Sequence, residues 1–223
     1  MTETQWRAVD DYFSDLLVTP DAALSEALER SAAAGLPPIS VSPSHGKLLH
    51  LLARAIDARA ILEIGTLGGY SAIWLARALP AGGRLITLEA EPAHAAVALA
   101  NIEAAGVGDR VEIRLGNAAD LLAAMVAAGE GPFDLVFIDA DKPSTAAYFQ
   151  WALQLARQGS LIVVDNVVRG GAVIDAAADD PGIEGVRRFI ELLAAEPRVT
   201  ATALQTVGGK GYDGFAIALV TTS

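Results

Sequence analysis

Along most of the chain, short apolar runs alternate with longer segments in which apolar residues recur at helical spacing. The short runs predict β-strands at residues 60–65, 84–90, 111–116, 133–140 and 160–166. The segments between them predict helices at residues 45–56, 71–79, 92–106, 121–129 and 146–157. Buried strands that alternate with helices are typical of a parallel sheet that is covered by helices on both faces.

The two ends of the chain depart from this alternation. Residues 1–35 predict two helices, which stop at Gly35 before two prolines. A helix at 183–195 is followed by two apolar segments, 199–207 and 214–221, which the glycine-rich stretch between them would join as an antiparallel hairpin. The whole pattern predicts an α/β fold, with a doubly wound, mostly parallel sheet of seven strands.

The chain shows no stretch with the composition of a linker between domains. We therefore expect residues 1–223 to form a single domain, with residues 1–35 as an N-terminal helical appendage. The apolar faces of these first helices exceed what a complete sheet domain needs for its own core, so we also expect a homodimer that forms through them.

Composition narrows the classes of function. Hydrophobic residues make up 52% of the 223 residues, enough for a sizeable core. No uncharged segment reaches the ~18 apolar residues that a membrane-spanning helix needs, and the first residues lack the basic and apolar regions of a signal peptide. We therefore expect a cytoplasmic protein without a membrane partner.

The charge and the cysteine content of the chain exclude further classes of function. The chain has no cysteine, which excludes disulfides, thiolate nucleophiles and cysteine-bound metals. Its formal net charge is −11 and no run of Lys and Arg is present, so a nucleic-acid partner is not expected. A small molecule is the expected partner.

Polar residues follow the predicted strands where each one ends. Because ligands of doubly wound sheets bind beyond the carboxyl ends of the strands, these residues are candidates for a binding site. The candidates are Glu63, Gly65, Thr66, Ser71, Glu89, Asn117, Ala118, Asp139, Asp165 and Asn166. Considered alone, the glycines predict an ordinary strand-to-helix turn, and Glu89 alone predicts an exposed strand end. Polar residues at the ends of five strands together favour a ligand-binding site.

The glycine turn between residues 65 and 69 does not have the spacing of a dinucleotide site. Gly65 is followed by Leu67 where the pattern G-x-G-x-x-G requires a second glycine, which argues against a pyrophosphate cradle. Glu63 would repel phosphate and suits a ligand with a cationic amino acid end. Glu89 could hold two ribose hydroxyls, as an acid does in related sites.

Asp139, Asp165 and Asn166 offer two carboxylates and a carboxamide on neighbouring strands. Such hard oxygen donors suit Mg²⁺, and also Mn²⁺ or Ca²⁺. Three histidines, at positions 45, 50 and 94, lack metal-ligand spacing and are expected to be ordinary helix residues.

Lys142 follows Asp139 by three residues and can reach the same edge of the sheet. Two interpretations remain open for it. It could take a proton from a hydroxyl group as a general base, or it could be a solvated lysine that pairs with Asp141.

Three segments, LEIGTLGGYSAIWLA, FDLVFIDADK and LIVVDNVV, together resemble the cation-dependent O-methyltransferases of the caffeoyl-CoA and catechol type. The resemblance covers about residues 38–221 and implies a Rossmann-like fold that binds S-adenosylmethionine. It implies cofactor contacts from Val41, Glu63, Gly65, Thr66, Ser71, Glu89, Ala118 and Asp139. It also implies that Asp139, Asp165 and Asn166 bind the metal and that Lys142 is the general base.

The segment around Val41 departs from the family pattern, because Ser44 and His45 stand where an acid and a glutamine are common. No counterpart of the third substrate-side carboxylate of the animal catechol enzymes can be identified either. Substrate contacts are expected in the loops 169–180 and 208–213 and in the first helices.

The sequence therefore predicts an S-adenosylmethionine- and divalent-metal-dependent O-methyltransferase that acts on a hydroxyl of a small catechol-like aromatic. Two alternatives stay open. One is an NAD(P)-dependent oxidoreductase on a similar fold, which the glycine spacing disfavours. The other is a non-catalytic, cofactor-binding dimer.

Overall fold

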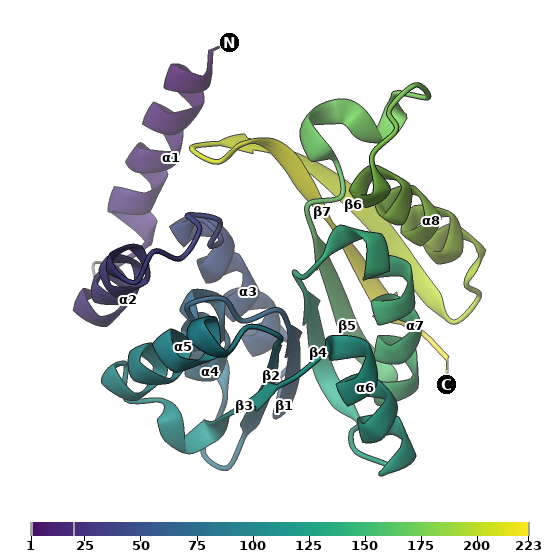
Figure 1. Ribbon diagram of the computed structural model, residues 1–223, viewed down its shortest axis with the longest axis horizontal. Coiled ribbons are helices and arrows are strands. Elements are labelled where there is room, and N and C mark those ends of the chain that lie inside the picture. The colour runs from purple at the N-terminus through teal and green to yellow at the C-terminus, as the bar shows by residue number, and fades with distance from the viewer. Residues whose placement is uncertain (1, 20, 223) are drawn as a thin grey trace.

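A seven-stranded sheet runs through the molecule in the order β3-β2-β1-β4-β5-β7-β6 (Figure 1). The computed structural model describes residues 2–19 and 21–222. The strands are β1 (Ala60–Ile64), β2 (Arg84–Glu89), β3 (Val111–Leu115), β4 (Phe133–Ile138), β5 (Ala156–Asp165), β6 (Val199–Gly208) and β7 (Gly211–Val220). Strands β1 to β5 pair in parallel, whereas β7 pairs antiparallel with both β5 and β6. The predicted fold class is confirmed.

Helices cover both faces of this sheet. The α-helices are α1 (Glu3–Leu17), α2 (Ala22–Ala33), α3 (Pro43–Ala55), α4 (Tyr70–Ala78), α5 (Pro92–Ala104), α6 (Ala118–Ala127), α7 (Thr145–Leu155) and α8 (Pro181–Ala195). Three short 3₁₀ helices are η1 (Gly108–Arg110), η2 (Lys142–Ser144) and η3 (Arg169–Ile174). Among the described residues, no helix is both long and apolar enough to cross a bilayer.

The alternation of side chains along the strands divides the core into two layers. On one face, α6, α7 and α8 pack against residues such as Leu62 and Val136. On the other face, the helices α2, α3, α4 and α5 pack against the strand residues that point the opposite way, such as Ile61 and Leu135. Strand β4 is buried from its first residue to its last, as expected for a strand covered on both faces, and Asp134 is its one charged residue.

Strand β5 is longer than the sequence predicts. It begins at Ala156 rather than at residue 160, and its pairing with β4 shifts register between Phe133 and Leu135. Gly159 has a φ of 89°, a conformation that glycine adopts without strain. This conformation allows β5 to continue across the shift in register. An apolar pattern does not reveal this extension, because residues 157–159 are polar or glycine and are exposed.

Helix α1 lies away from most of the sheet and contacts the β6–β7 hairpin and α3 (Figure 1). At the hairpin tip, the backbone N–H of Gly209 donates to Asp10 Oδ2 at 2.7 Å. No residue of α1 is buried. The two predicted N-terminal helices are thus present, except that residues 1 and 20 of the predicted appendage lie outside the described residues.

Candidate active site

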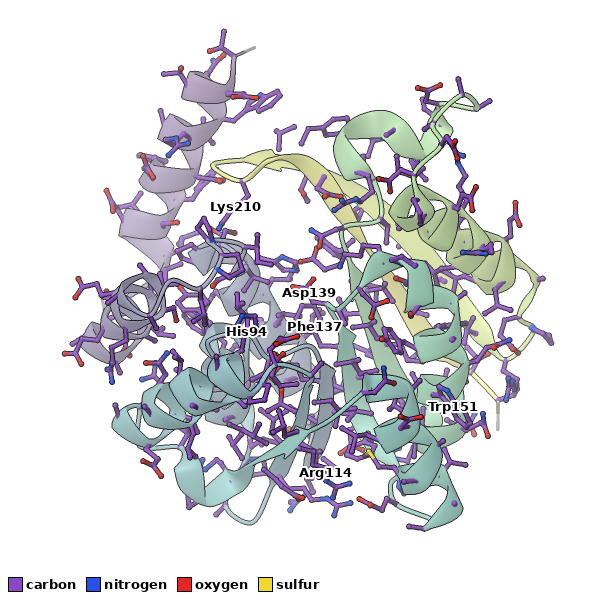
Figure 2. All side chains as sticks on the ribbon, in the orientation of Figure 1. His94, Arg114, Phe137, Asp139, Trp151 and Lys210 are labelled. Carbon is purple, nitrogen blue, oxygen red and sulfur yellow. The ribbon has the colours of Figure 1, made fainter. Side chains whose placement is uncertain are left out.

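A cavity of about 980 Å³ opens at the carboxyl ends of the parallel strands. Strand ends, the segment before α3 and the tip of the β6–β7 hairpin form its wall. The predicted site residues that line it are Val41, Gly65, Thr66, Ser71, Glu89, Ala118, Asp139, Lys142, Asp165 and Asn166. Figure 2 labels three residues that line the cavity. Asp139 follows β4, His94 lies on α5, and Lys210 lies at the tip of the β6–β7 hairpin. The structure therefore brings all but one of the predicted site residues to one cavity.

Gly65 makes the close approach of two strand ends possible. A Cβ atom at this position would lie 2.1 Å from the backbone oxygen of Asp139, so any other residue would push β1 and β4 apart. Its φ of 97° is also a conformation that other residues rarely adopt. The turn after β1 and the acidic end of β4 are adjacent for this reason.

Glu63 is the predicted residue that does not line the cavity. It is fully buried at the end of β1, and its Oε2 accepts a hydrogen bond of 2.6 Å from Thr87. Its Oε1 has no hydrogen-bond partner among the described residues. Burial raises the pKa of Glu63 from 4.5 to about 7, even though the hydroxyl groups of Ser71 and Thr87 favour the charged form. Near neutral pH the carboxyl group is thus divided between its two protonation states.

The carboxylate of Glu89 is held by the glycine turn. Its Oε2 accepts from the backbone N–H groups of Thr66 at 3.2 Å and Leu67 at 2.7 Å, and its Oε1 accepts from Glu91 N at 2.9 Å. These bonds fix the side chain at the cavity wall. Oε1 accepts only one of these bonds and has a further lone pair, so the group can still accept from a ligand hydroxyl.

Two carboxylates face the cavity from β4 and β5. Asp165 is only 7% exposed, and burial, followed by the negative charge of Asp139, raises its pKa from 3.8 to about 7. Asn166 has a φ of 59°, in the left-handed region that asparagine tolerates, and its N–H donates to Asp165 Oδ1 at 2.8 Å. The charge of Asp139 therefore disfavours the charged form of Asp165, and the positive charge of Lys142 offsets only part of this effect.

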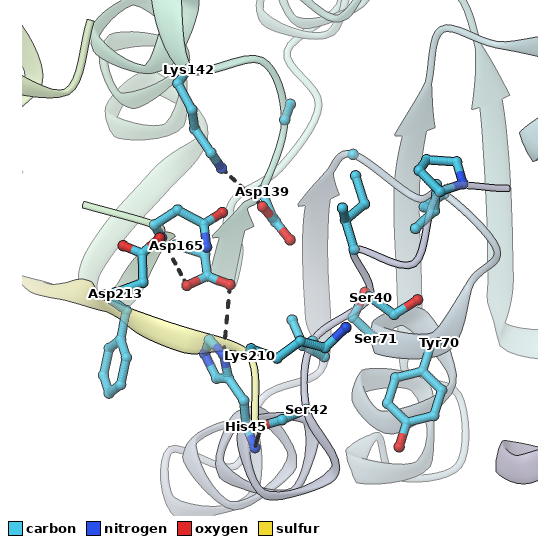
Figure 3. A pocket seen from close by; sticks show the side chains of 18 of the residues that line it. Ser40, Ser42, His45, Tyr70, Ser71, Asp139, Lys142, Asp165, Lys210 and Asp213 are labelled. Carbon is cyan, nitrogen blue, oxygen red and sulfur yellow. Dashed lines mark hydrogen bonds and ion pairs between the residues drawn. The ribbon is translucent and has the colours of Figure 1, made fainter. Parts of the chain in front are cut away.

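Lys142 directs its ammonium group into the same cluster (Figure 3). Nζ lies 2.9 Å from Asp139 Oδ1, and the lysine side chain is 12% exposed. Helix α8 holds the lysine backbone in place, since a Cβ atom at Gly185 would lie 2.1 Å from the Lys142 carbonyl oxygen. The carboxylate of Asp141, which was the alternative partner, instead accepts from the hydroxyl of Tyr148. Lys142 is consequently neither solvated nor paired with Asp141.

Two of the histidines that were expected to be ordinary helix residues line the cavity, and one of them, His94, has Nδ1 at 3.6 Å from Glu89 Oε1. The other, His45, has Nδ1 at 3.6 Å from Asp165 Oδ2. Burial lowers its pKa, which favours the neutral ring although Asp139 opposes the shift. The departure of the segment at residues 44–45 from the family pattern was the signal that could have drawn attention to it.

Two residues of the predicted substrate loop 208–213, Lys210 and Asp213, come from the hairpin, and their individual contacts were not predicted. Lys210 extends from the hairpin tip over the cavity and donates to the carbonyl oxygen of Pro38 at 2.9 Å (Figure 3). Asp213 also lines the cavity, and its Oδ1 accepts from the backbone N–H groups of Val168, Arg169 and Gly214. Asp213 thereby ties the loop after β5 to the start of β7. The predicted substrate loop 208–213 is at the cavity, as expected.

The sheet order and the oxygen-rich cavity at the strand ends define a ligand-binding enzyme of the Rossmann-like class. The sequence profile described as O-methyltransferase matches residues 17–218. A catechol O-methyltransferase from Niastella koreensis is 55% identical over 99% of this chain and 100% of its own length.

Two solved structures are similar over the whole chain. One is the O-methyltransferase from Bacillus cereus in complex with SAH, at 57% identity and a TM-score of 0.97, covering 99% of this chain and 100% of that one. The other is TomG from Streptomyces achromogenes, an O-methyltransferase involved in tomaymycin synthesis, in complex with SAM. It is 55% identical with a TM-score of 0.95 and covers 99% of each chain. The chain belongs to the O-methyltransferase family, and the resemblance inferred from its motifs is confirmed.

Proposed function

We propose that this O-methyltransferase moves the methyl group of S-adenosylmethionine to one hydroxyl of a small catechol-like aromatic, with a divalent cation bound at the acidic end of the sheet. One observation carries the proposal. Asp139, Asp165 and Asn166 line the same cavity as Lys142 and the glycine turn, so a cofactor site, a metal site and a proton acceptor are within reach of one acceptor molecule.

The cofactor half of the cavity has the features that S-adenosylmethionine requires. Gly65 and Thr66 present backbone to the cavity, and Glu89 presents a fixed carboxylate for ribose hydroxyls. Behind the turn, the negative charge that the buried Glu63 can carry would favour a cationic group such as the ammonium of the methionine end at this part of the cavity. The solved relatives that bind SAH and SAM support this assignment.

The residues present also fit a divalent cation. Among the described residues, no three His, Cys, Asp or Glu side chains cluster as a metal site, and the third donor of the proposed set is the carboxamide of Asn166. Two carboxylates and an amide oxygen match Mg²⁺, with Mn²⁺ and Ca²⁺ as further candidates. Burial, followed by the charge of Asp139, raises the pKa of Asp165 although Lys142 opposes the shift, and a divalent ion would add further positive charge beside the two carboxylates; this supports the proposed cation site.

The reaction is an in-line displacement at the methyl carbon, in which alignment of the acceptor oxygen provides much of the rate. A bound divalent cation would make a nearby acceptor hydroxyl more acidic. The chain's own residues orient the acceptor and move the proton. Lys142 is held by Asp139 and by the packing of α8 against its backbone, and as the neutral amine it would receive the hydroxyl proton at Nζ. A divalent cation at the neighbouring carboxylates would favour this neutral form, because a nearby positive charge lowers the pKa of a lysine.

The two alternatives have less support. The glycine turn lacks dinucleotide spacing, and membership in the O-methyltransferase family favours methyl transfer over hydride transfer. A non-catalytic binding role would not require Lys142 to be held 2.9 Å from Asp139 within the cavity. We further propose that the whole chain acts as one catalytic domain; its cytoplasmic location stays a prediction.

A methyl-transfer assay with labelled S-adenosylmethionine tests the proposal. The acceptors are catechols, hydroxycinnamates and flavonoids, each paired with an analogue that lacks one of the two neighbouring hydroxyls. We expect a labelled methyl ether from the vicinal diols and at least tenfold less from their single-hydroxyl analogues. Equal turnover of both members of each pair would contradict the proposed diol requirement.

A further inference from the structure

We propose that His45 is a positioning residue that fixes the carboxylate of Asp165 for metal binding. The inference rests on the proposed metal site and adds a residue that lies outside the donor set. The starting observation is the direction of the imidazole ring: Nδ1 points at Asp165 Oδ2 across 3.6 Å, and the side chains are 16% and 10% exposed (Figure 3). The proposed role places the imidazole proton on Nδ1, so that an N–H faces the carboxylate oxygen.

The ring is held by the strands that carry the acidic residues. It stacks on Phe215 with centroids 5.3 Å apart and an angle of 30° between the rings, and it meets Phe137 edge-on at 6.2 Å. Phe215 is the register partner of Asp165 in the β5–β7 pairing. Phe137 is on β4 and lies two residues before Asp139, which follows the strand. The imidazole of His45, which α3 carries, is therefore packed directly against the strands that lead to the acidic residues.

Asp165 is constrained from both sides. Its Oδ1 accepts from Asn166 N at 2.8 Å, while its Oδ2 faces His45 Nδ1. A carboxylate with a fixed neighbour for each oxygen has lost much of its freedom to rotate before a metal arrives. Residues around a metal site that orient a ligand in this way raise metal affinity because less order has to be gained on binding.

No other polar contact explains the orientation of His45 within the described part of the chain. Its Nε2 is buried without a hydrogen-bond partner there, so the ring is directed by aromatic packing and by Asp165. His50 lies on the same helix and provides the contrast. Its Nδ1 is 3.2 Å from the carbonyl oxygen of Trp74, and it does not line the cavity.

The test is Mn²⁺ binding by isothermal titration calorimetry, with SAH present at saturation and no acceptor. His45→Phe keeps an aromatic ring but removes the N–H, whereas His45→Gln restores an N–H donor near the carboxylate. We expect the Mn²⁺ Kd to rise about 10- to 100-fold in His45→Phe and about threefold or less in His45→Gln. His50→Phe, the matched control on α3, should retain the parental Kd.

The SAH affinity of each variant reports whether the site is still folded, and it should stay at the parental value. If His45→Phe does not fold, His45→Leu takes its place with the same expectation. A parental Mn²⁺ Kd in the Phe or Leu variant would overturn the role of His45 and leave the metal site intact. Equal weakening in the Gln variant would also overturn it, because packing alone would then be responsible. Absence of Mn²⁺ binding in the parent would overturn both this inference and the proposed metal dependence.

Discussion

Glu63 is a carboxyl group that titrates close to physiological pH inside the core. Burial raises its pKa from 4.5 to about 7, so the charged form destabilises the folded protein in this range and its cost is absent below pH 4.5. A ligand that brings a cationic ammonium group near Glu63 would favour the carboxylate and lower this pKa. Binding near pH 7 would then release a fraction of a proton.

We predict that the binding enthalpy of S-adenosylmethionine at pH 7 depends on the ionisation enthalpy of the buffer, with the sign of proton release. Glu63→Gln should reduce this dependence, because glutamine does not titrate. Isothermal titration calorimetry in phosphate, HEPES and Tris buffers measures how the binding enthalpy depends on the buffer. A parental enthalpy that is the same in all three buffers would contradict the proposed contact of Glu63 with the cofactor.

Lys142 is the second residue whose role can be tested alone. If it receives the hydroxyl proton, Lys142→Ala should lower kcat by about 10²- to 10⁴-fold while the affinity for SAH changes little. Lys142→Arg should not restore activity, because a guanidinium group stays protonated. Steady-state kinetics with a catechol acceptor measures kcat for each variant. A near-parental kcat in Lys142→Ala would show that Lys142 is not the proton acceptor.

At the scale of elements, Asp134 joins three strands at the edge opposite the cavity. Its Oδ2 accepts from the backbone N–H groups of Arg59 and Ala60 at the start of β1, and its Oδ1 pairs with Arg157 on β5. Burial alone would raise the pKa of Asp134, but these hydrogen bonds outweigh it and the net pKa lies below 3.8. The charged form therefore stabilises the fold above pH 3.8, and this contribution is lost as the pH falls through the lowered pKa.

We predict that Asp134→Ala lowers the free energy of unfolding by about 1.5–3 kcal/mol at pH 7, the usual range for hydrogen bonds to a charged group. The difference from the parent should shrink as the pH falls below 3.8. Urea unfolding across this pH range measures both effects. Glu26→Ala, which removes an exposed ion pair with Arg30 on α2, is the control and should change stability little. Equal effects of the two substitutions would refute the account.

The strands and the residues at their ends could be predicted from the sequence because both depend on local patterns. Apolar runs mark β1 to β5, and the parallel topology places Asp139 and Asp165 at the same edge. The rest depends on contacts between distant segments. His45 reaches Asp165 through the packing of α3 on the sheet, and Lys210 reaches Pro38 across 172 positions of sequence. The exclusion of Glu63 from the cavity wall likewise follows from tertiary packing rather than from its place in a motif.

At the scale of the whole molecule, apolar surface remains exposed on α1. Phe13, Leu16 and Leu17 lie at helical spacing and are 48%, 65% and 66% exposed. Leu204 on β6, the edge strand that packs near α1, is also 50% exposed. Surface of this kind is typical of an interface between subunits, which supports the predicted homodimer.

We predict that the protein sediments as a dimer at micromolar concentration and that Leu17→Glu shifts it toward monomer, because a buried charge without a partner opposes association. Ile174→Glu is the matched control: Ile174 is 89% exposed but lies on η3, far along the chain from α1. Sedimentation velocity provides the measurement. A monomeric parent, or an equal shift in the control, would show that α1 does not form the interface.

Methyl transfer in the presence and absence of a chelator tests the central claim most directly. We predict that excess chelator abolishes turnover of a catechol acceptor, that Mg²⁺ or Mn²⁺ restores it, and that SAH binding persists throughout. Asp165→Ala should behave like the chelated parent even with Mg²⁺ in excess, because the oxygen donor set is then incomplete. Full turnover in excess chelator, with SAH bound normally, would contradict a metal-dependent mechanism.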